Sequence, residues 1–369
     1  MFETFLLVFT LFYAFQIIVF CLAALAARYP TRPGFTPTVD IVIAARNEEQ
    51  GIGACLASIV NLTYPKDRLR VVVVDDRSTD GTAPIVRGYS AEHPWITLLT
   101  AAPGTGHLQG KTNAVTQAIE ATSGEVILFT DADCEVPPRW VEETVQSYTD
   151  EKVGIVAGFT SLTGRRLFEK MQALDWFVLF SVASGVIRLG FPITAVGTNL
   201  SVRRRAYDAV GGYRSIPFSV TEDFALFQAV TGTGGFKARF PRNRSALVMS
   251  HPCRDWRELY RQKKRWFAGG KGMDLLNVAV FAMDYVFSLA LIAAIFIAPS
   301  ALLGSLIVKL VVDFLMTLPA LSTFRRWDAL AAFPLYELYY FLYVLIYPPL
   351  VLLTHDVLWK EREFGSLTG

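Results

Sequence analysis

The sequence predicts an α/β protein: a Rossmann-like, mostly parallel sheet in a cytoplasmic domain, with one N-terminal and about three C-terminal transmembrane helices. Two observations predict it. Between residues 39 and 157, apolar β-branched runs alternate with helical stretches, the pattern of right-handed strand–helix–strand units. Long apolar runs flank this region, and 52% hydrophobic residues with a mean hydropathy of +0.36 exceed the values of ordinary soluble enzymes.

The first apolar run, Phe5–Ala27, holds 23 uncharged residues, enough to cross roughly 30 Å of hydrocarbon as a helix. It predicts an N-terminal anchor over residues 1–28. The alternative is a cleaved signal peptide, because Ala24–Ala26 resembles a cleavage site, but the run is too long and no positive charge precedes it. Since Glu3 precedes the run and Arg28 follows it, we expect the next segment in the cytoplasm.

The cytoplasmic segment alternates strand and helix signals. In such a sheet, ligands bind outside the carboxyl ends of the strands, so the architecture is of a nucleotide-binding type. The predicted strands are Val39–Ala44, Leu69–Asp75, Thr97–Thr100, Val126–Thr130 and Val153–Ala157, and the predicted helices lie near residues 50–61, 82–89 and 111–122.

Carboxylates follow two of these strands. Asp75 and Asp76 end one apolar run, and the triplet Asp131-Ala132-Asp133 ends another. Because the carboxyl ends of parallel strands lie at one edge of a sheet, both clusters can converge on one crevice. An Asp-x-Asp pair supplies hard oxygen ligands for Mg²⁺ or Mn²⁺ bridging a diphosphate. The sequence therefore predicts a metal and nucleotide site.

A further apolar run, Trp176–Ile187, is only 12 residues long between Asp175 and Arg188. Runs of this length are too short to span a bilayer and form buried or interfacial helices. We expect an interfacial segment near residues 168–190.

Three apolar stretches close the chain, at about residues 277–297, 301–321 and 330–354, and predict the C-terminal transmembrane region 277–354. Arg325 and Arg326 in the second connection indicate a cytoplasmic face. Four crossings return the tail, residues 355–369, to the outside; an additional re-entrant or interfacial segment is the alternative.

Charge and cysteine content exclude other classes. A net charge of +2 without a long basic run argues against nucleic acid as a partner. The four cysteines are scattered without a CxxC motif, which argues against zinc and against a disulfide framework.

Seven motifs follow one another in the chain: Ala44–Glu49, Asp75–Thr82, Gly110–Ala114, Asp131–Asp133, Gly197–Asn199, Thr221–Asp223 and Gln262–Trp266. In this order they resemble the motifs of membrane-bound family 2 glycosyltransferases of the GT-A fold. The resemblance covers about Thr38 to Trp266 and implies a glycosyltransferase domain over residues 38–270.

The resemblance implies a nucleotide-sugar donor, a UDP-sugar, and a divalent metal, Mg²⁺ or Mn²⁺, without an organic redox cofactor. Local sequence offers simpler alternatives for these residues. Asp75 and Asp76 can form a strand-ending turn, with Asp80 as a helix cap. The Asp131–Asp133 cluster can be a loop without metal, and Lys111 can be a solvated surface lysine. The implied donor-binding residues are Ala44, Arg46, Glu48, Asp75, Asp76, Lys111 and Asp131, and the implied metal ligands are Asp133 and Asp131.

The resemblance further implies that Asp223 is the general base of an inverting attack, for which a partly desolvated carboxylate is suited. Gln262, Arg265 and Trp266 would close over the donor, with Arg265 neutralising the departing diphosphate and Trp266 lining the acceptor path. Locally, Asp223 also fits a helix N-terminus, and the Gln262–Trp266 stretch a juxtamembrane basic belt. The implied acceptor region is Asn199, Glu222 and Trp266.

For the acceptor, few crossings and an interfacial segment favour a membrane lipid hydroxyl at the cytoplasmic face of the cell inner membrane. Similar family members glucosylate ceramide, diacylglycerol, carotenoid or hopanoid lipids, and Trp359–Arg362 resembles that group. The alternative is a processive polysaccharide synthase of the cellulose, hyaluronan or poly-N-acetylglucosamine type, with Asp284, Lys309, Asp313 and Glu337 lining a channel unless Lys309 and Asp313 pair. A non-catalytic membrane protein that retains the fold is the third hypothesis.

Overall fold

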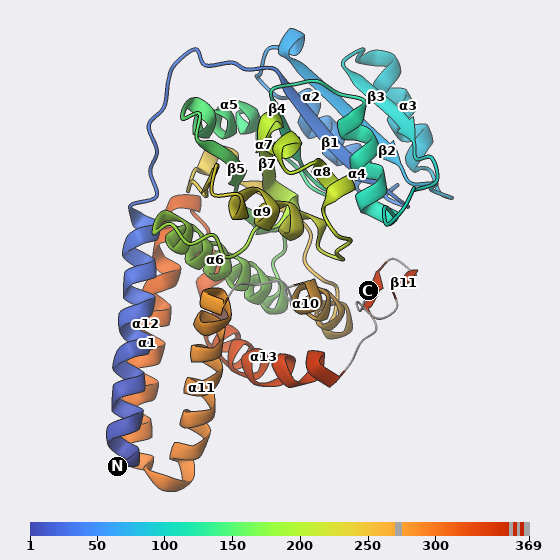
Figure 1. Cartoon of the computed structure of the whole chain (residues 1–369). Helices are drawn as coiled ribbons and strands as arrows, with labels where there is room; N and C mark the ends of the chain where they lie inside the picture. Colours follow the sequence, from blue (N-terminus) through green and yellow to red (C-terminus); the bar gives the residue numbers. More distant parts are fainter. Residues whose placement is uncertain (270–274, 354–356, 360–361, 365–369) are drawn as a thin grey trace. The chain divides into compact units, whose positions relative to one another are not determined.

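The structure is a computed structural model that describes residues 1–269, 275–353, 357–359 and 362–364 (Figure 1). The chain divides into two compact units, each considered by itself. The α/β unit is Ala27–Thr163 with Thr194–His251, and the helical unit is Met1–Ala26, Gly164–Ile193 and Pro252–Gly369.

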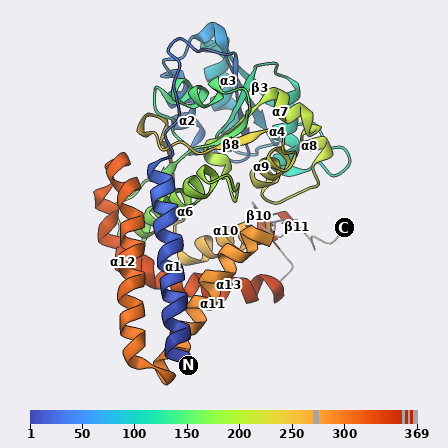
Figure 2. The same ribbon diagram turned by 60° about the vertical axis from the view of Figure 1, so that its left-hand side comes forward.

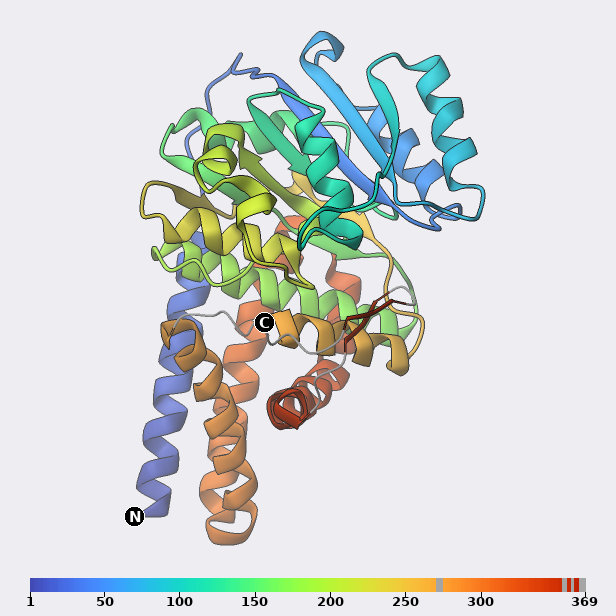
Figure 3. The same ribbon diagram turned by 45° about the vertical axis from the view of Figure 1, so that its right-hand side comes forward.

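A seven-stranded sheet with the order β3-β2-β1-β4-β7-β5-β8 forms the centre of the α/β unit (Figure 3). Neighbouring strands pair in parallel except around β7, which is antiparallel to both β4 and β5, so the predicted mostly parallel sheet is confirmed. The strands are β1 Val39–Ala45, β2 Leu69–Asp75, β3 Ile96–Thr100, β4 Val126–Phe129, β5 Val153–Ala157, β7 Leu200–Arg203 and β8 Lys237–Arg239; β6 Thr160–Leu162 and β9 Val248–Ser250 form a second, two-stranded sheet.

Helices connect these strands at the predicted places. The expected helices near residues 50–61, 82–89 and 111–122 are α2, α3 and α4, each shifted by a few residues at its ends. The helices of the α/β unit are α2 Ile52–Val60, α3 Thr82–Glu92, α4 Gly110–Glu120, α5 Trp140–Val145, α7 Arg204–Ala209, α8 Gly212–Ser215 and α9 Glu222–Gly232.

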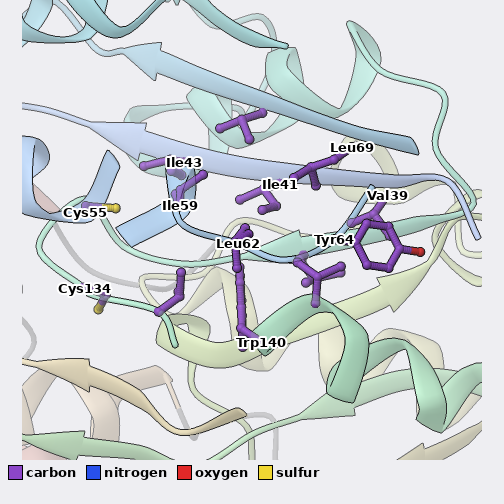
Figure 4. Close-up of a cluster of buried hydrophobic side chains, with 14 of the residues drawn as sticks. Val39, Ile41, Ile43, Cys55, Ile59, Leu62, Tyr64, Leu69, Cys134 and Trp140 are labelled. Atoms are coloured by element: carbon purple, nitrogen blue, oxygen red, sulfur yellow. The ribbon is translucent and has the colours of Figure 1, made fainter. Parts of the chain in front are cut away.

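Buried aliphatic side chains of the strands form the core beneath the sheet, together with Trp140 (Figure 4). Ile41 and Ile43 on β1 and Cys55 on α2 are fully buried. Each fully buried aliphatic or aromatic side chain contributes roughly 1.5–3 kcal/mol. Because helices cover the sheet, its central strands are apolar on both faces. In the sequence these strands therefore appear as continuous apolar runs and not as alternating apolar and polar residues.

The strand order reverses between β1 and β4. From β1 the chain builds outward through β2 and β3, and then returns to place β4 on the other side of β1. Such a reversal separates the loops that follow the two strands and opens a crevice at their carboxyl ends. The loops beginning at Arg46 and at Thr130 therefore border the expected ligand site.

The helical unit contains long apolar helices at the predicted positions. By length and composition alone, four segments are long and apolar enough to cross a membrane: Phe2–Leu25, Leu167–Arg188, Pro299–Phe324 and Trp327–Leu350, while Ala282–Ile297 is a shorter apolar helix. The elements are α1 Phe2–Leu25, α6 Leu167–Arg188, α10 Trp256–Gly269, α11 Leu275–Ile297, α12 Pro299–Phe324, the 3₁₀ helix η6 Trp327–Ala332, and α13 Phe333–Leu353; β10 Val357–Trp359 and β11 Arg362–Phe364 pair antiparallel in the tail.

Helix α6 is longer than the apolar run Trp176–Ile187 indicated. It holds 22 residues and so meets the length of a membrane span, which corrects the expectation that this segment is too short. The helix continues through Asp175 because Lys263 on α10 neutralises that buried carboxylate. Within the 18-residue window that qualifies it, 78% of residues are buried inside the protein, as expected for a helix covered by its neighbours.

Helices α1 and α12 lie side by side and run in the same direction (Figure 2). Thr10 donates to Ser305 (2.9 Å), and Tyr13 donates to Asp313 (2.7 Å), so the contacts advance together along both helices. Helix α6 crosses α1 at Gly185, where a Cβ would lie 2.3 Å from the carbonyl oxygen of Phe20. A glycine at this position permits the close approach of the two helices.

The ionisable residues of the long apolar helices pair with one another. The ammonium of Lys309 lies 2.6 Å from a carboxylate oxygen of Asp313 and 2.6 Å from one of Glu337. Tyr340 donates to Asp284 at 2.7 Å. Lys309, Asp313 and Glu337 are all buried, so their charges compensate within the protein instead of being solvated.

This network gives a stability prediction. We expect Lys309→Met to lower the free energy of unfolding by about 3–5 kcal/mol, because it leaves buried carboxylates without their cation. Thermal unfolding in detergent measures the effect, and Lys309→Arg, which retains the charge, is the matched control. Equal melting temperatures for Lys309→Met and wild type would contradict this account of the network.

Candidate active site

Hydrogen bonds hold the loop after β1 and the loop after β2 together, and we call this hydrogen-bonded region the clasp. Asn47 and Arg77, at the ends of these strands, have positive φ values of 52° and 57°. The amide oxygen of Asn47 accepts from the N–H of Thr79 (2.9 Å), and its own N–H donates to Ser78 (3.0 Å). The carboxylate of Glu49 accepts from the N–H of Gly81 (2.8 Å). Sparsely populated backbone conformations persist where surrounding bonds fix them, and they concentrate at functional sites.

Asp75 and Asp76 lie inside this clasp, 5% and 4% exposed. Asp75 accepts from the N–H of Ser78 (3.1 Å), so the strand-ending turn is present. Arg46 donates to the carbonyl of Asp76 (2.9 Å) and its guanidinium lies 3.7 Å from the Asp76 carboxylate. The guanidinium of Arg77 lies 3.8 Å from the other carboxylate oxygen of Asp76. Two cations thus hold the Asp76 carboxylate at the edge of the crevice.

Two further predicted donor-binding residues, Ala44 and Glu48, lie next to the clasp in the chain. Ala44 is half-buried on β1, in register with Val74 of β2. The N–H of Glu48 donates to the hydroxyl of Thr82 (2.8 Å). Asp80, which precedes the N-cap residue Gly81 of α3, accepts from the N–H of Thr82 (3.0 Å) and from that of Glu49 (3.1 Å).

Lys111 joins the two sides of the site. Its ammonium donates to Asp131 (2.7 Å) from the loop after β4 and pairs with Glu222 (2.9 Å) at the start of α9. Burial by itself would lower the pKa of Lys111, but the charges of Asp131, Glu222 and Asp223 outweigh it and raise the pKa well above its ordinary value. The structure therefore brings three predicted site carboxylates, Asp131, Glu222 and Asp223, around the ammonium of Lys111.

Asp223 is in the first turn of α9. One carboxylate oxygen accepts from the N–H of Gly197 (2.5 Å) and the other from the N–H of Phe224 (2.8 Å). Burial first, and the charge of Glu222 second, raise the pKa of Asp223 to about 6, against the opposing effect of Lys111. A carboxylate with a pKa near the working pH is suited to take up a proton as a general base.

The loops after β1 and β4 approach each other closely at Gly51. A Cβ on Gly51 would lie 3.0 Å from the Cα of Asp133, tighter than ordinary contacts. The approach places the Asp133 backbone against the start of α2.

The second acidic cluster has the donor chemistry of a hard divalent cation. The carboxyl of Asp131 is 31% exposed, and Asp133 is half-buried. Among the described residues, no group of three or more His, Cys, Asp or Glu side chains could hold a metal by itself. Mg²⁺ commonly takes one or two protein carboxylates and completes its shell with substrate phosphates and water. The residues present fit an ion shared with a diphosphate.

Asn199, predicted for the acceptor region, is 3% exposed. Its amide N–H groups donate to the carbonyls of Phe159 (2.8 Å) and Ala246 (2.9 Å), and its oxygen accepts from the Trp140 indole (2.9 Å). These bonds give Asn199 a structural role, tying η3 (Gly197–Asn199) to the core. Its contribution to the acceptor site stays a prediction that the contacts do not favour.

Gln262, Arg265 and Trp266 belong to the helical unit, where all three lie half-buried on α10. The Trp266 ring is 5.6 Å from the Trp176 ring of α6.

Sequence reasoning missed the partners that hold the site residues. Lys111 was expected to meet the donor, yet it pairs with Asp131 and Glu222, and no local pattern indicates that pairing. The sequence does contain one signal for the clasp: asparagine is one of the few residues that adopt positive φ, and Asn47 lies two residues after the end of β1.

Gly197 offers a test of the geometry around Asp223. A Cβ there would lie 3.1 Å from the Asp223 carboxylate oxygen that its N–H now binds. We expect Gly197→Ala to displace that carboxylate and to lower turnover about tenfold or more, with the fold retained, because small misplacements are costly in catalysis. Circular dichroism and turnover measure the two quantities. The control is Gly232→Ala, since a Cβ at Gly232 meets nothing within 4 Å; equal turnover in both variants would contradict the prediction.

Comparisons with known proteins show the family of the chain. The family model described as Glycosyl transferase family 2 matches residues 40–211, and that described as Glycosyl transferase family group 2 matches residues 126–353. The chain is 31% identical over 250 residues to probable glycosyltransferase YdaM of Bacillus subtilis, covering 66% of this chain and 58% of that protein. It is 30% identical over 246 residues to beta-monoglucosyldiacylglycerol synthase of Nostoc, covering 64% of this chain and 50% of that protein.

A solved structure resembles nearly the whole chain. The mannosyltransferase PcManGT from Pyrobaculum calidifontis, in complex with GDP-Man and Mn²⁺, superposes with a TM-score of 0.60 at 21% identity, covering 93% of this chain and 96% of that one. At this identity the likeness shows the fold. The chain spans about half to three fifths of the two curated relatives named above.

Proposed function

Because the chain belongs to glycosyl transferase family 2 and has the GT-A fold, we propose that it moves a hexosyl group from a UDP-sugar to the hydroxyl of a membrane lipid, with inversion at the anomeric carbon. The observation that carries the proposal is Asp223, a carboxylate fixed by two backbone N–H groups with its pKa raised to about 6. It stands beside Lys111 and the acidic cluster after β4.

In this mechanism the acceptor oxygen attacks the anomeric carbon while its proton passes to the Asp223 carboxylate. The bond between the anomeric carbon and the phosphate oxygen breaks, and its electron pair leaves with the nucleoside diphosphate. Glu222, paired with Lys111, orients that lysine toward the acidic cluster. Arg265 of α10 would neutralise charge on the departing diphosphate, and Gln262 and Trp266 would close over the donor.

Asp131 and Asp133 would hold a divalent metal, Mg²⁺ or Mn²⁺. When bound, such an ion stabilises negative charge on the leaving diphosphate without a proton transfer. Lys111 already balances the Asp131 carboxylate in the structure, so the chain itself keeps this cluster partly neutralised. The Asp75 and Asp76 region would receive the nucleoside, where Arg46 and the clasp fix its walls.

The lipid acceptor is supported by the apolar helices and by the name of the Nostoc relative, a glucosyldiacylglycerol synthase. Helix α6 runs across α1, α11 and α12 in the helical unit (Figure 1), the direction of a helix lying along a membrane surface. The charged residues Lys309, Asp313 and Glu337 pair with one another, which removes the need for a polar channel as their explanation. We place the α/β unit on the cytoplasmic side of the cell inner membrane, because Arg28 and Arg325 follow helices α1 and α12, which run in parallel.

Mass spectrometry of total lipids and of polymer fractions tests the proposal. Cells expressing wild type or Asp223→Asn are supplied with labelled sugar precursors. A discrete glycolipid made by wild type and lost in the variant is the expected result and identifies both sugar and acceptor. A long labelled polymer would assign the chain to the polysaccharide synthases instead, and no labelled product from either would favour a non-catalytic protein.

A further inference from the structure

A buried ion pair joins α6 to α10 in the middle of the Gln262–Trp266 motif. The ammonium of Lys263 lies 2.5 Å from a carboxylate oxygen of Asp175, and the two side chains are 3% and 6% exposed. Removing two charges from water costs several kcal/mol per ion, which the pair recovers only with good geometry. No step of the proposed reaction uses either residue.

The same ammonium faces two aromatic rings. It lies 4.5 Å from the centroid of the Trp266 ring and 5.2 Å from that of Tyr343 on α13. A cation over an indole face is attracted by the ring's electron density, and more strongly when the pair is desolvated. On another side, the Trp176 ring lies 5.6 Å from that of Trp266. Lys263 and Trp176 therefore restrict where the Trp266 ring can lie.

A second connection fixes the start of α10 to the same helix. The side-chain amide of Gln172 donates to the carbonyl of Cys253 (3.0 Å) and accepts from its N–H (2.8 Å). Gln172 is almost one helical turn before Asp175 on α6, and Cys253 precedes α10. Helix α10 is thus held at its beginning by Gln172 and at its centre by Asp175, which limits both its rotation and its sliding.

We propose that Lys263 and Asp175 are positioning residues that hold the Trp266 ring in the orientation used for acceptor binding. This inference rests on the proposed function for the role of Trp266. Stability alone gives a different expectation, because well-packed apolar residues replace buried ion pairs without loss in many proteins. The two explanations separate when the pair is replaced on both sides at once.

The experiment compares four variants of the full chain in detergent or lipid nanodiscs. Lys263→Met breaks the pair, the double variant Lys263→Met with Asp175→Leu removes both charges and keeps apolar volume, and Lys263→Arg retains a cation. Arg166→Met is the matched control, because it removes a cation from the exposed pair with Glu169 on the same helix. Melting temperature, KM for the lipid acceptor, kcat, and hydrolysis of the donor by water are measured for each.

We expect the double variant to melt near the wild-type temperature while its KM for the lipid rises about tenfold to a hundredfold, since small misplacements of a binding group have effects of this size. Donor hydrolysis stays near wild type, and Lys263→Arg recovers most of the acceptor affinity. A double variant that recovers both stability and acceptor KM would overturn the proposal and leave the pair a purely structural role.

A readout independent of activity keeps this test separate from the proposed function. Tryptophan emission of the double variant should differ from wild type, and the difference should disappear when both carry Trp266→Phe. Unchanged emission would overturn the positioning role. If wild type makes no glycosylated product, the proposed function fails, whereas an emission difference that depends on Trp266 still supports the positioning of its ring.

Discussion

Asp223→Asn is expected to lower kcat by about 10²–10⁴-fold while the KM for the donor changes little, because the amide keeps the shape of the side chain but cannot accept the proton of the acceptor hydroxyl. Steady-state kinetics with a labelled donor measures both constants. Comparable losses in kcat and donor affinity would instead give Asp223 a structural role. Asp208→Asn, an exposed aspartate on α7, is the control and should resemble wild type.

The pH profile provides an independent check of the same residue. Burial and Glu222 raise the pKa of Asp223 to about 6, with Lys111 opposing, so wild-type kcat should rise with pH and level off above 6. At one pH unit below that pKa the rate should be about tenfold under its plateau, since only about a tenth of the base is ionised. The neighbouring Tyr213 is buried and its pKa is raised well above its ordinary value, so it stays neutral in this range.

The sign of the linked stability follows from the same shift. A carboxyl whose folded-state pKa lies above its unfolded value binds more protons when folded, so the contribution of Asp223 to stability falls as pH rises through about 4 to 6. At neutral pH, Asp223→Asn should therefore be at least as stable as wild type. A lower melting temperature for the variant at pH 7 would indicate that the carboxylate is needed for the fold.

Asp133→Ala is expected to abolish metal-dependent transfer, with a loss of about 10²–10³-fold or more, because the leaving diphosphate loses its fixed cation. Binding of Mn²⁺, followed by electron paramagnetic resonance in the presence of nucleoside diphosphate, should weaken in parallel. This second measurement does not depend on turnover.

The matched control for Asp133→Ala is Glu135→Ala, since Glu135 is an exposed carboxylate two residues further along the same loop. It should bind the ion and turn over like wild type. Undiminished transfer by Asp133→Ala, or equal Mn²⁺ binding in both variants, would remove the metal assignment.

The strands that the sequence predicts well are those buried on both faces. β2 consists of Leu69–Asp75 as expected, because its run of valines is apolar at consecutive positions and ends in a charged pair. β7 was not predicted: Leu200–Arg203 has four residues, and its place between β4 and β5 depends on pairing with strands distant in the sequence. Short strands of this kind gain their stability from neighbours rather than from local pattern.

In the candidate site, too, some features could be predicted from local sequence and others depend on contacts between distant residues. Acidic residues at strand ends were predictable, because sheet geometry places Asp75 and Asp131 at one edge. The pairing of Lys111 with Glu222 was not, since it joins residues more than a hundred positions apart, at the starts of α4 and α9. The sequence predicts too short a helix at α6 because Asp175 bounds the apolar run. In the structure, Lys263 on α10 pairs with Asp175, and this ion pair allows a charged residue inside the helix.

The parallel packing of α1 on α12 constrains the order in which the chain can mature. Thr10 and Tyr13 are synthesised early. Their hydrogen-bond partners, Ser305 and Asp313, leave the ribosome about three hundred residues later. Until then the Tyr13 hydroxyl of α1 lacks the carboxylate that it later binds, while the α/β unit, whose sequence lies between segments of the helical unit, is already being synthesised. A nascent chain arrested before Pro299 should consequently contain the whole α/β unit together with an α1 that lacks its partner helix, and the packing of α12 on α1 becomes a late step of folding.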